Sequence, residues 1–438
     1  MSDAARADVE GKVDVVVIGA GLAGLRAAVD LVDAGRNVVV LEGRERVGGR
    51  VWTHRFGNGQ TCEHGAEFID TNHARVISLA KELGLTLADV MSGHDPTRRL
   101  LDVGGRAAPF AFHHSLAGDL VRWGEALDRI ATTIDPDDPV SGPSAAVLDD
   151  LALSALANDL QLGLMGRVAI GREIRTEFML GPDEISQLFA GWMTALHRRS
   201  PGGREAYRIA GGNDQLASGL AAQLGDRIRV GAHVDLVDPD AGRIVLVDGE
   251  VITAANIVNT APLPALGRMW FDMPLELSRV GYGLGGKVSV QVGRRIWNDS
   301  GLDGSVDTER AWGQMWDGSD SQPGDTGVLT TLLSSHDGSA LVAVPDTVER
   351  VIDEADRLFP GIKAMTGERV RADWTNDRFS LGCYATFGPG QLLDAWPFLR
   401  RRYGRMLLAG EHTDAYCGFM EGALRSGSRV AQELLVNG

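Results

Sequence analysis

The chain has 438 residues, a length that exceeds what one compact core usually fills, so two domains are expected. Its formal net charge of −16 argues against a nucleic-acid partner, and no run of about 20 apolar residues predicts a membrane span. Three cysteines form no disulfide framework and residues 1–12 contain no apolar signal segment, so a soluble, cytoplasmic protein is predicted.

The stretch from residue 13 to residue 42 predicts a strand, a helix and a second strand. Val15–Ile18 is a β-branched run typical of strands that are buried on both faces. The helix is expected to end near Gly35, and Val38–Leu41 forms the second strand. That strand finishes at Glu42, whose carboxylate can accept hydrogen bonds from the ribose of an adenosine.

The turn between the first strand and the helix carries the pattern G-x-G-x-x-G. Gly19 permits the tight turn, Gly21 lets the backbone approach a pyrophosphate, and Gly24 lets the helix pack against the strand. Because the strands, the helix and the terminal acid stand in register, the stretch predicts dinucleotide binding rather than an ordinary turn. It does not separate FAD from NAD.

A basic loop with a double glycine follows the second strand. Gly48 and Gly49 expose consecutive N–H groups to phosphate oxygens, and Arg44 and Arg50 add positive charge beside them. The alternative interpretation is a solvated basic loop.

The segment VLEGRERVGGRVWT, residues 40–53, resembles the FAD-binding N-terminus of the flavin amine oxidases, the monoamine oxidase and polyamine oxidase superfamily. The similarity resumes near the end of the chain. It implies an α/β fold, in which a Rossmann-like FAD-binding domain of the glutathione-reductase type carries an inserted α+β substrate domain. The expected FAD-binding domain comprises 1–75, 205–280 and 374–438, and the substrate domain 76–204 and 281–373.

The segment TCEHGAEFID leads into a helix that Asp70 or Thr71 is expected to cap. The resemblance places Gly65 and Ala66 along the flavin, with a neighbouring side chain turned to the substrate. Monoamine oxidases carry an aromatic residue where this chain has Glu67. A carboxylate there attracts a cationic amine in one interpretation and pairs with an arginine or caps a turn in the other; the sequence leaves both open.

Between residues 84 and 200 the pattern predicts the helical part of the substrate domain. No metal-ligand spacing appears, because His113 and His114 are adjacent and point to opposite sides of an element, so no metal is expected. The helices are expected at 119–133, 144–153 and 183–197. Several large side chains are predicted to belong to the core rather than to line a cavity: Phe178, Met179, Phe189, Trp192 and Met193.

A second dinucleotide-domain segment is expected from about residue 207. The resemblance places the backbone at Val234 against the adenine. A helix is predicted at 216–224, and strands at 228–230, 234–237, 243–247, 251–253 and 257–260.

Lys287 stands on a predicted strand in GLGGKVSVQV, and on residue pattern alone it is equally a surface lysine at a strand start. The resemblance sharpens this, because the matching lysine in the family holds a water that is hydrogen-bonded to flavin N5. Residues 312–327 are predicted to form a glycine- and acid-rich loop, and 348–358 a helix.

The last part of the chain carries the most specific match. A tryptophan followed by a cysteine–tyrosine pair, here Trp374, Cys383 and Tyr384, has the spacing seen in monoamine oxidases. The resemblance implies that Cys383 carries FAD as an 8α-S-cysteinyl thioether. The alternative is that Cys383 is a small buried hydrophobe.

Residues 407–427 match the closing fingerprint of the family, with a strand, Gly410 and Glu411 in the following loop, and a helix from about Met420. The helix N-terminus is expected to face the flavin N1–C2=O edge. Phe419 and Tyr384 stand where monoamine oxidases have two tyrosines that flank the amine. In this chain one ring lacks the hydroxyl group.

The resemblance implies an FAD-dependent amine oxidase that turns a small amine into an imine and reduces O2 to hydrogen peroxide. An L-amino-acid oxidase, a desaturase-like flavoenzyme and a non-catalytic flavoprotein scaffold are the alternatives. The sequence is compatible with a homodimer without predicting one.

Overall fold

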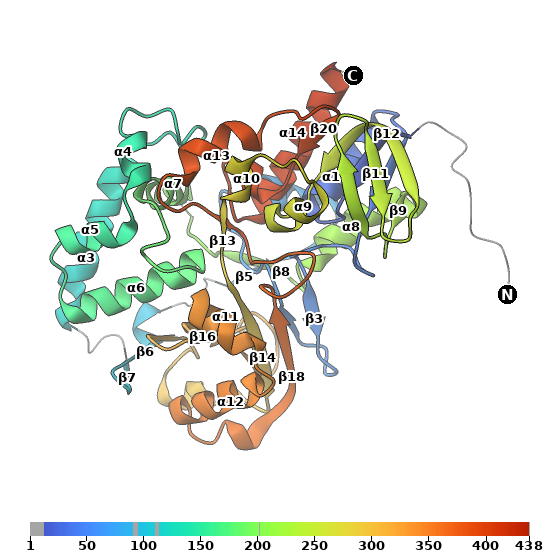
Figure 1. The fold of residues 1–438 in the computed structure, drawn as a ribbon. Coiled ribbons are helices and arrows are strands. Elements are labelled where there is room, and N and C mark those ends of the chain that lie inside the picture. Colours follow the sequence, from blue (N-terminus) through green and yellow to red (C-terminus); the bar gives the residue numbers. More distant parts are fainter. Residues whose placement is uncertain (1–12, 91–94, 110–113, 201, 438) are drawn as a thin grey trace.

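The computed structural model describes the chain except for residues 1–12, 91–94, 110–113, 201 and 438. His113 and the first twelve residues of the predicted FAD-binding domain therefore lie outside the described residues. Figure 1 shows a strand-rich region at the upper right, a group of helices at the left and a second sheet with its helices at the bottom.

The first sheet is built around the two strands that flank the glycine-rich turn. Its central strand β1 pairs in parallel with β2 on one side and with β12 on the other. The strand order is β10-β11-β12-β1-β2-β9, and β20 also pairs with β12. The bounds are β1 Val13–Ile18, β2 Val38–Leu41, β9 Ile228–Arg229, β10 Val234–Asp238, β11 Arg243–Leu246, β12 Val251–Asn259 and β20 Met406–Leu408.

Helices cover this sheet because their apolar faces match its β-branched surface. α1 packs closely on α14, and a Cβ at Gly427 would come within 2.3 Å of the Ala23 carbonyl oxygen. Only glycine allows that approach. The bounds are α1 Leu22–Asp33, α8 Asp214–Leu224 and α14 Met420–Asn437.

The second sheet has the order β18-β14-β17-β16-β15-β6-β7 and carries α11 and α12. Its strands β14 and β17 are almost entirely buried, which explains their apolar composition. The bounds are β6 Leu100–Val103, β7 Arg106–Pro109, β14 Gly285–Val292, β15 Val306–Thr308, β16 Gln314–Asp317, β17 Gly327–Ser334, β18 Thr366–Asp373, α11 Ser335–Ala343 and α12 Thr347–Leu358.

The helical region differs from the prediction in two ways. The helix expected over 144–153 ends at Asp150 because Leu151 is extended, and a second helix that was not predicted covers residues 153–159. A helix over 164–178 had no prediction. The bounds are α3 His114–Ala131, α4 Ala145–Asp150, α5 Leu153–Asp159, α6 Leu164–Phe178 and α7 Gln187–His197.

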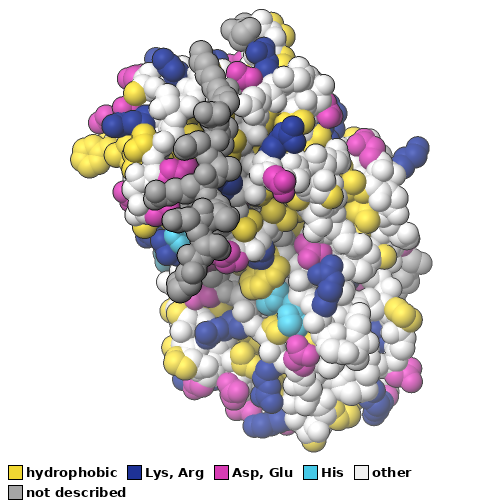
Figure 2. All heavy atoms as spheres, turned by 90° about the vertical axis from the view of Figure 1, so that its right-hand side faces the viewer, with side chains coloured by type: hydrophobic (Ala, Val, Ile, Leu, Met, Phe, Trp, Pro, Cys, Tyr) yellow, Lys and Arg dark blue, Asp and Glu magenta, His cyan; other side chains and the backbone are white. Residues whose placement is uncertain are grey.

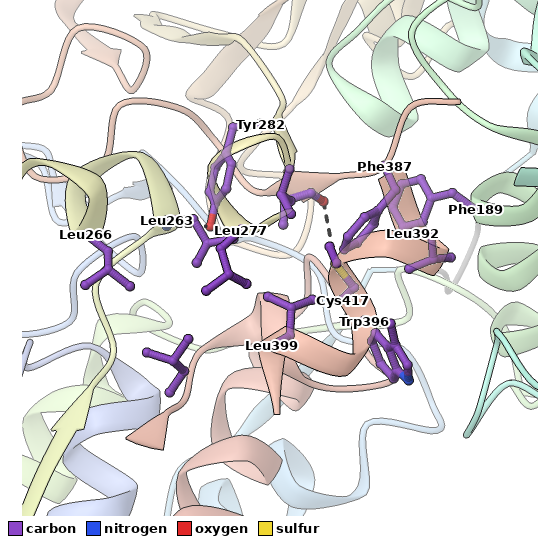
Figure 3. Close-up of a cluster of buried hydrophobic side chains, with 14 of the residues drawn as sticks. Phe189, Leu263, Leu266, Leu277, Tyr282, Phe387, Leu392, Trp396, Leu399 and Cys417 are labelled. Atoms are coloured by element: carbon purple, nitrogen blue, oxygen red, sulfur yellow. Dashed lines mark hydrogen bonds between the residues drawn. The ribbon is translucent and has the colours of Figure 1, made fainter. Parts of the chain in front are cut away.

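An apolar cluster joins the helical region to the first sheet. Figure 3 shows Phe189 and Phe387 close together, with Trp396 and Cys417 beside them. The Cys417 thiol donates to the Ala385 carbonyl oxygen at 3.5 Å. α13, Gln391–Leu399, contributes Trp396, and this packing fixes the position of the segment that contains Tyr384.

Three further predictions are wrong. α2, Ala74–Glu82, is not capped by Asp70 or Thr71: the Glu421 carboxylate accepts from the backbone N–H groups of the first turn instead. Strands expected separately at 251–253 and 257–260 are one strand, β12, which continues from an antiparallel pairing into a parallel one. The loop predicted over 312–327 contains β16, because its apolar residues pair with β17.

The surface mixes charges of both signs. Figure 2 shows basic and acidic side chains spread over the face that it presents. None of the helices within the described residues combines the length and apolar character needed to cross a membrane. We keep the predicted division into two domains as a proposal.

Candidate functional site

A cavity of about 570 Å³ is lined by residues from both sheets and from the helical region. Its wall includes Gly19 after β1, Lys287 on β14 and Phe189 on α7. Segments that are far apart in the sequence therefore share one concave surface, which is the usual form of a cofactor and substrate site.

The glycine-rich turn fits a phosphate-bearing ligand. Gly19 has a φ of +100°, and a Cβ at Gly24 would lie 1.9 Å from the Gly19 carbonyl oxygen, so α1 begins as close to the turn as glycine permits. A Cβ atom added to Gly21 would have no other atom within 4 Å, and the backbone of Gly21 faces the cavity. Gly49 approaches Gly21 from the next loop. The two loops leave room for a pyrophosphate at a helix N-terminus.

Glu42 lies buried at the end of β2 and lines the cavity. Its carboxylate accepts from the Ala20 and Arg44 backbone N–H groups, each at 2.8 Å. Since a carboxylate has about four acceptor positions, two remain for a ribose. The Arg44 side chain pairs with Asp377 and donates to Ser380, and thus ties this end of the cavity to the segment before Cys383.

A buried ion pair joins the first and last parts of the chain. Arg50 donates to the Glu411 carboxylate at 2.9 Å and to the Cys383 carbonyl oxygen at 2.8 Å. Glu411 also accepts from the Gly418 N–H at 2.8 Å. Burial opposes ionisation of Glu411, but Arg50, His412 and the Gly418 N–H together outweigh it and hold the pKa of the carboxyl below its usual range.

Trp374 lies against the loop that contains Gly65, and both Trp374 and Cys383 line the cavity. The Trp374 indole N–H donates to the His64 carbonyl oxygen at 2.7 Å. The Cys383 N–H donates to the Gly283 carbonyl oxygen at 2.7 Å, and the residue lines the cavity. Burial raises the pKa of the Cys383 thiol to about 12, although Arg50 favours the thiolate. The thiol is therefore neutral at pH 7 in this environment.

Lys287 is not the surface lysine that its strand position alone would allow. Its side chain is 10% exposed, and Nζ donates to the Glu67 carboxylate at 2.6 Å and to the Gly65 carbonyl oxygen at 2.9 Å. Nζ also lies 5.3 Å from the ring centroid of Trp316. Both partners of the ion pair line the cavity.

Glu67 forms an ion pair with an arginine, which is one of the two roles that the sequence left open for it. Arg208 lies 2.9 Å from one carboxylate oxygen, and the Trp316 indole N–H donates to that same oxygen at 2.9 Å. Burial opposes ionisation of Glu67, but Lys287 and Arg208 together hold the pKa of its carboxyl below the usual range. Asp320 pairs with Arg208 in turn, so two cations face two carboxylates.

The two aromatic residues expected to flank a substrate both line the cavity. The Tyr384 hydroxyl donates to the Glu177 carbonyl oxygen at 2.7 Å, which fixes its ring. The Phe419 ring lies beside His73 and His197, with centroid distances of 5.1 Å and 6.1 Å.

Acidic side chains that had no sequence signal lie beside the aromatic pair. Asp70, Glu177 and Glu205 line the cavity, and Arg204 pairs with Glu177 at 2.6 Å. Glu205 is exposed on the cavity wall. Desolvation within the cavity, with Glu177 and Asp70 nearby, raises its pKa to about 7 despite Arg204. The His197 imidazole is 3.7 Å from Glu177, and burial lowers its pKa. Burial also raises the pKa of Asp70. Three carboxylates face one arginine in this group, so its net charge is negative once Asp70 and Glu205 are ionised.

The cavity brings together nearly all of the predicted site residues. Gly24 does not line it, in keeping with a packing role. The predicted residues that do line it are Gly19, Gly21, Glu42, Arg44, Gly48, Gly49, Arg50, Gly65, Ala66, Glu67, Val234, Lys287, Trp374, Cys383, Tyr384, Gly410, Glu411, Phe419 and Met420. Their individual roles stay predictions.

Five large side chains of the helical region were predicted to belong to the core rather than to line a cavity, and this prediction is wrong for four of them. Phe178, Met179, Phe189 and Met193 are buried and also line the cavity, whereas Trp192 does not line it. Helical periodicity could not make this distinction, because a cavity wall and a core face are equally apolar.

Comparison with known proteins gives a consistent result. The family model for flavin-containing amine oxidoreductases matches residues 22–435. Amine oxidase [flavin-containing] B is 28% identical in Cavia porcellus and 26% identical in Homo sapiens, with 97% of this chain and 86% of each relative covered.

Solved structures resemble the whole chain. A cyclohexylamine oxidase from Brevibacterium oxydans has a TM-score of 0.85 and 25% identity, covering 98% of this chain and 99% of that one. A putrescine oxidase variant redesigned for cofactor binding has a TM-score of 0.87 at 23% identity, with 98% and 99% covered, and shares the fold.

Proposed function

The chain belongs to the flavin-containing amine oxidoreductase family, and from this premise we propose that it oxidises a small amine held between Tyr384 and Phe419. The protein is an FAD-dependent amine oxidase. The product is an imine, which water hydrolyses, and we propose O2 as the electron acceptor with hydrogen peroxide as its product. Cytoplasmic location and homodimer formation stay predictions.

Bound FAD supplies the acceptor for the hydrogen and the two electrons that leave the amine carbon. The chain binds and orients both molecules: Gly21 and Gly49 leave room for the pyrophosphate, Glu42 accepts from the ribose, and the aromatic pair positions the amine. Buried apolar walls exclude water and lower the pKa of the bound amine, so that its nitrogen is unprotonated when the C–H bond breaks.

The observation that carries this proposal is that the glycine-rich turn, Lys287 and the aromatic pair share one cavity. An anaerobic screen of amines tests it, with bleaching of the flavin absorbance as the signal. We expect at least one small amine to bleach the flavin and air to restore it. Failure of every amine class, in a protein that dithionite still reduces, would leave the non-catalytic scaffold as the better interpretation.

An L-amino-acid oxidase is the less favoured alternative because it needs a cation for the substrate carboxylate. Two arginines in this region are already paired, Arg204 with Glu177 and Arg208 with Glu67. The excess carboxylates there repel a carboxylate ligand.

The aromatic pair gives the first testable expectation. Tyr384→Ala and Phe419→Ala each remove a cavity wall, so we expect amine turnover to fall by about tenfold or more because the amine is no longer held in a productive orientation. Flavin content is expected to stay unchanged. Steady-state kinetics and the absorbance spectrum of each variant measure both quantities, and parent-like kinetics in both variants would contradict the role.

The acidic group points to an amine with a second positive charge. Glu205 is the carboxylate best suited to such a charge, because it lines the cavity and no side-chain hydrogen bond or ion pair engages it among the described residues. At pH 8 we expect Glu205→Gln to raise KM for a terminal diamine by about tenfold, a loss of about 1.4 kcal/mol. KM for the monoamine of equal length is expected to stay unchanged.

The KM for the diamine is expected to depend on pH in one direction. The pKa of Glu205 is about 7, so the carboxylate is charged above that pH and neutral below it. Diamine binding should weaken as the pH falls through 7, and this limb should vanish in Glu205→Gln. Equal KM changes for diamine and monoamine would show that the residue is only structural.

A further inference from the structure

Lys287 has a direct protein partner at the place where the family resemblance implies a water-holding lysine. An ammonium group has three N–H donors. Two of them are used, one by the Glu67 carboxylate at 2.6 Å and one by the Gly65 carbonyl oxygen at 2.9 Å. One donor is left for the cavity that Lys287 lines.

Glu67 is itself held from the far side. Its other carboxylate oxygen accepts from the Trp316 indole and lies 2.9 Å from Arg208, and Glu67 is 6% exposed. The carboxylate therefore cannot rotate away without leaving two buried donors unpaired. The Glu67 carboxylate is therefore held in one position, and the flexible Lys287 side chain is hydrogen-bonded to it.

We propose that Glu67 is a positioning residue that acts through Lys287 and sets where the lysine charge lies in the cavity. A flexible four-carbon stem otherwise lets an ammonium group sample many positions. With Glu67 and Gly65 as two fixed acceptors, Nζ has one position and one remaining donor. Glu67 thus fixes how strongly this cation stabilises negative charge on a flavin bound in the cavity.

This proposal rests on the proposed function only in that FAD occupies the cavity, and its test needs no amine. Sulfite forms a bond from its sulfur to N5 of oxidised flavin, placing the sulfite electron pair and a negative charge on the ring. Its dissociation constant, read from the bleaching of the flavin absorbance of the holoenzyme, therefore reports the positive charge near the ring.

The decisive variant is Glu67→Asp, which keeps the charge and withdraws the carboxylate by about 1.5 Å, one carbon–carbon bond. We expect it to weaken sulfite binding about fivefold, approaching the roughly tenfold weakening expected for Lys287→Met. In the Lys287→Met background, Glu67→Asp should change the dissociation constant by less than about twofold, because no lysine is left to position.

The matched control is Glu63→Asp, the same shortening at a buried carboxylate four positions earlier. Glu63 accepts from Thr53 and from the Asn213 N–H, and it makes no hydrogen bond to Lys287. Its variant should bind sulfite as the parent does. A parent-like dissociation constant for a folded, FAD-loaded Glu67→Asp protein, or an equal effect of Glu67→Asp with and without Lys287, would overturn the proposal. If the effect of Glu67→Asp on sulfite binding depends on Lys287 as expected but no amine is oxidised, the result would count against the proposed function alone.

Discussion

Acid denaturation of the parent protein is expected to carry the yellow flavin into the pellet, whereas the Cys383→Ala variant releases it all into the supernatant. Cys383 lines the cavity, and the Arg50 guanidinium donates to its carbonyl oxygen. A thioether to the flavin 8α carbon survives acid, and a non-covalent complex does not. In such an attachment the thiol would lose its proton, a C–H bond of the 8α methyl group would break with loss of a proton, and sulfur would bond to that carbon. The two electrons would reduce the flavin, and O2 would take them up to give hydrogen peroxide.

The thiol pKa of about 12 adds a kinetic expectation. Only the thiolate reacts, so attachment in FAD-reconstituted apoprotein should be slow at pH 7 and speed up as the pH rises. The measurement is the pelleted fraction of flavin over time at several pH values.

The other two cysteines serve as controls, one outside the cavity and one in its wall. Cys62 is packed against Phe56 and Val328 and does not line the cavity. Cys417 lines the cavity, but its thiol donates to Ala385 and lies 3.7 Å from the Glu411 carboxylate. Alanine at either position should leave the flavin attached. If the parent flavin stays in the supernatant, Cys383 is only a buried apolar residue.

Glu411→Ala is expected to destabilise the protein by about 3 kcal/mol, because it leaves the Arg50 charge, whose side chain is only 20% exposed, without its partner. Glu411 is 5% exposed and accepts from Arg50 and from the Gly418 N–H. Its carboxylate links the loop after β20 to the turn before α14, next to the residues that border the cavity. FAD content should fall together with stability.

Urea unfolding followed by tryptophan fluorescence measures this change. Glu411→Gln is the control, since an amide oxygen still accepts from Arg50 and only the charge is lost, and it should cost markedly less. Glu250→Ala removes an exposed partner of Arg229 and is expected to cost about 1 kcal/mol or less. A Glu411→Ala protein as stable as the parent would show that Arg50 finds another partner.

The sequence by itself determined those elements whose sequence patterns lie within a short stretch of the chain. The first strand, the glycine-rich turn and Glu42 were predicted from residues within a few positions of one another, because periodicity and turn chemistry act over one or two turns of chain. The closing segment through Met420 was predicted from the family resemblance. Family resemblance added FAD and amine oxidation, which the comparisons bear out.

Only the tertiary structure decided which charges meet. Glu67 and Lys287 are 220 positions apart, and Arg50 and Glu411 are 361 apart. No local pattern encodes such pairs, because they form only when two sheets and a helical insertion close around one cavity. The same closure places Phe189, a buried core residue, in the cavity wall as well, and brings Glu177 and Glu205 beside the aromatic pair. Charged partners that the fold brings close lower the pKa values of Glu67, Glu177 and Glu411 against the effect of burial, whereas desolvation raises that of Glu205. These shifts depend on the surrounding fold.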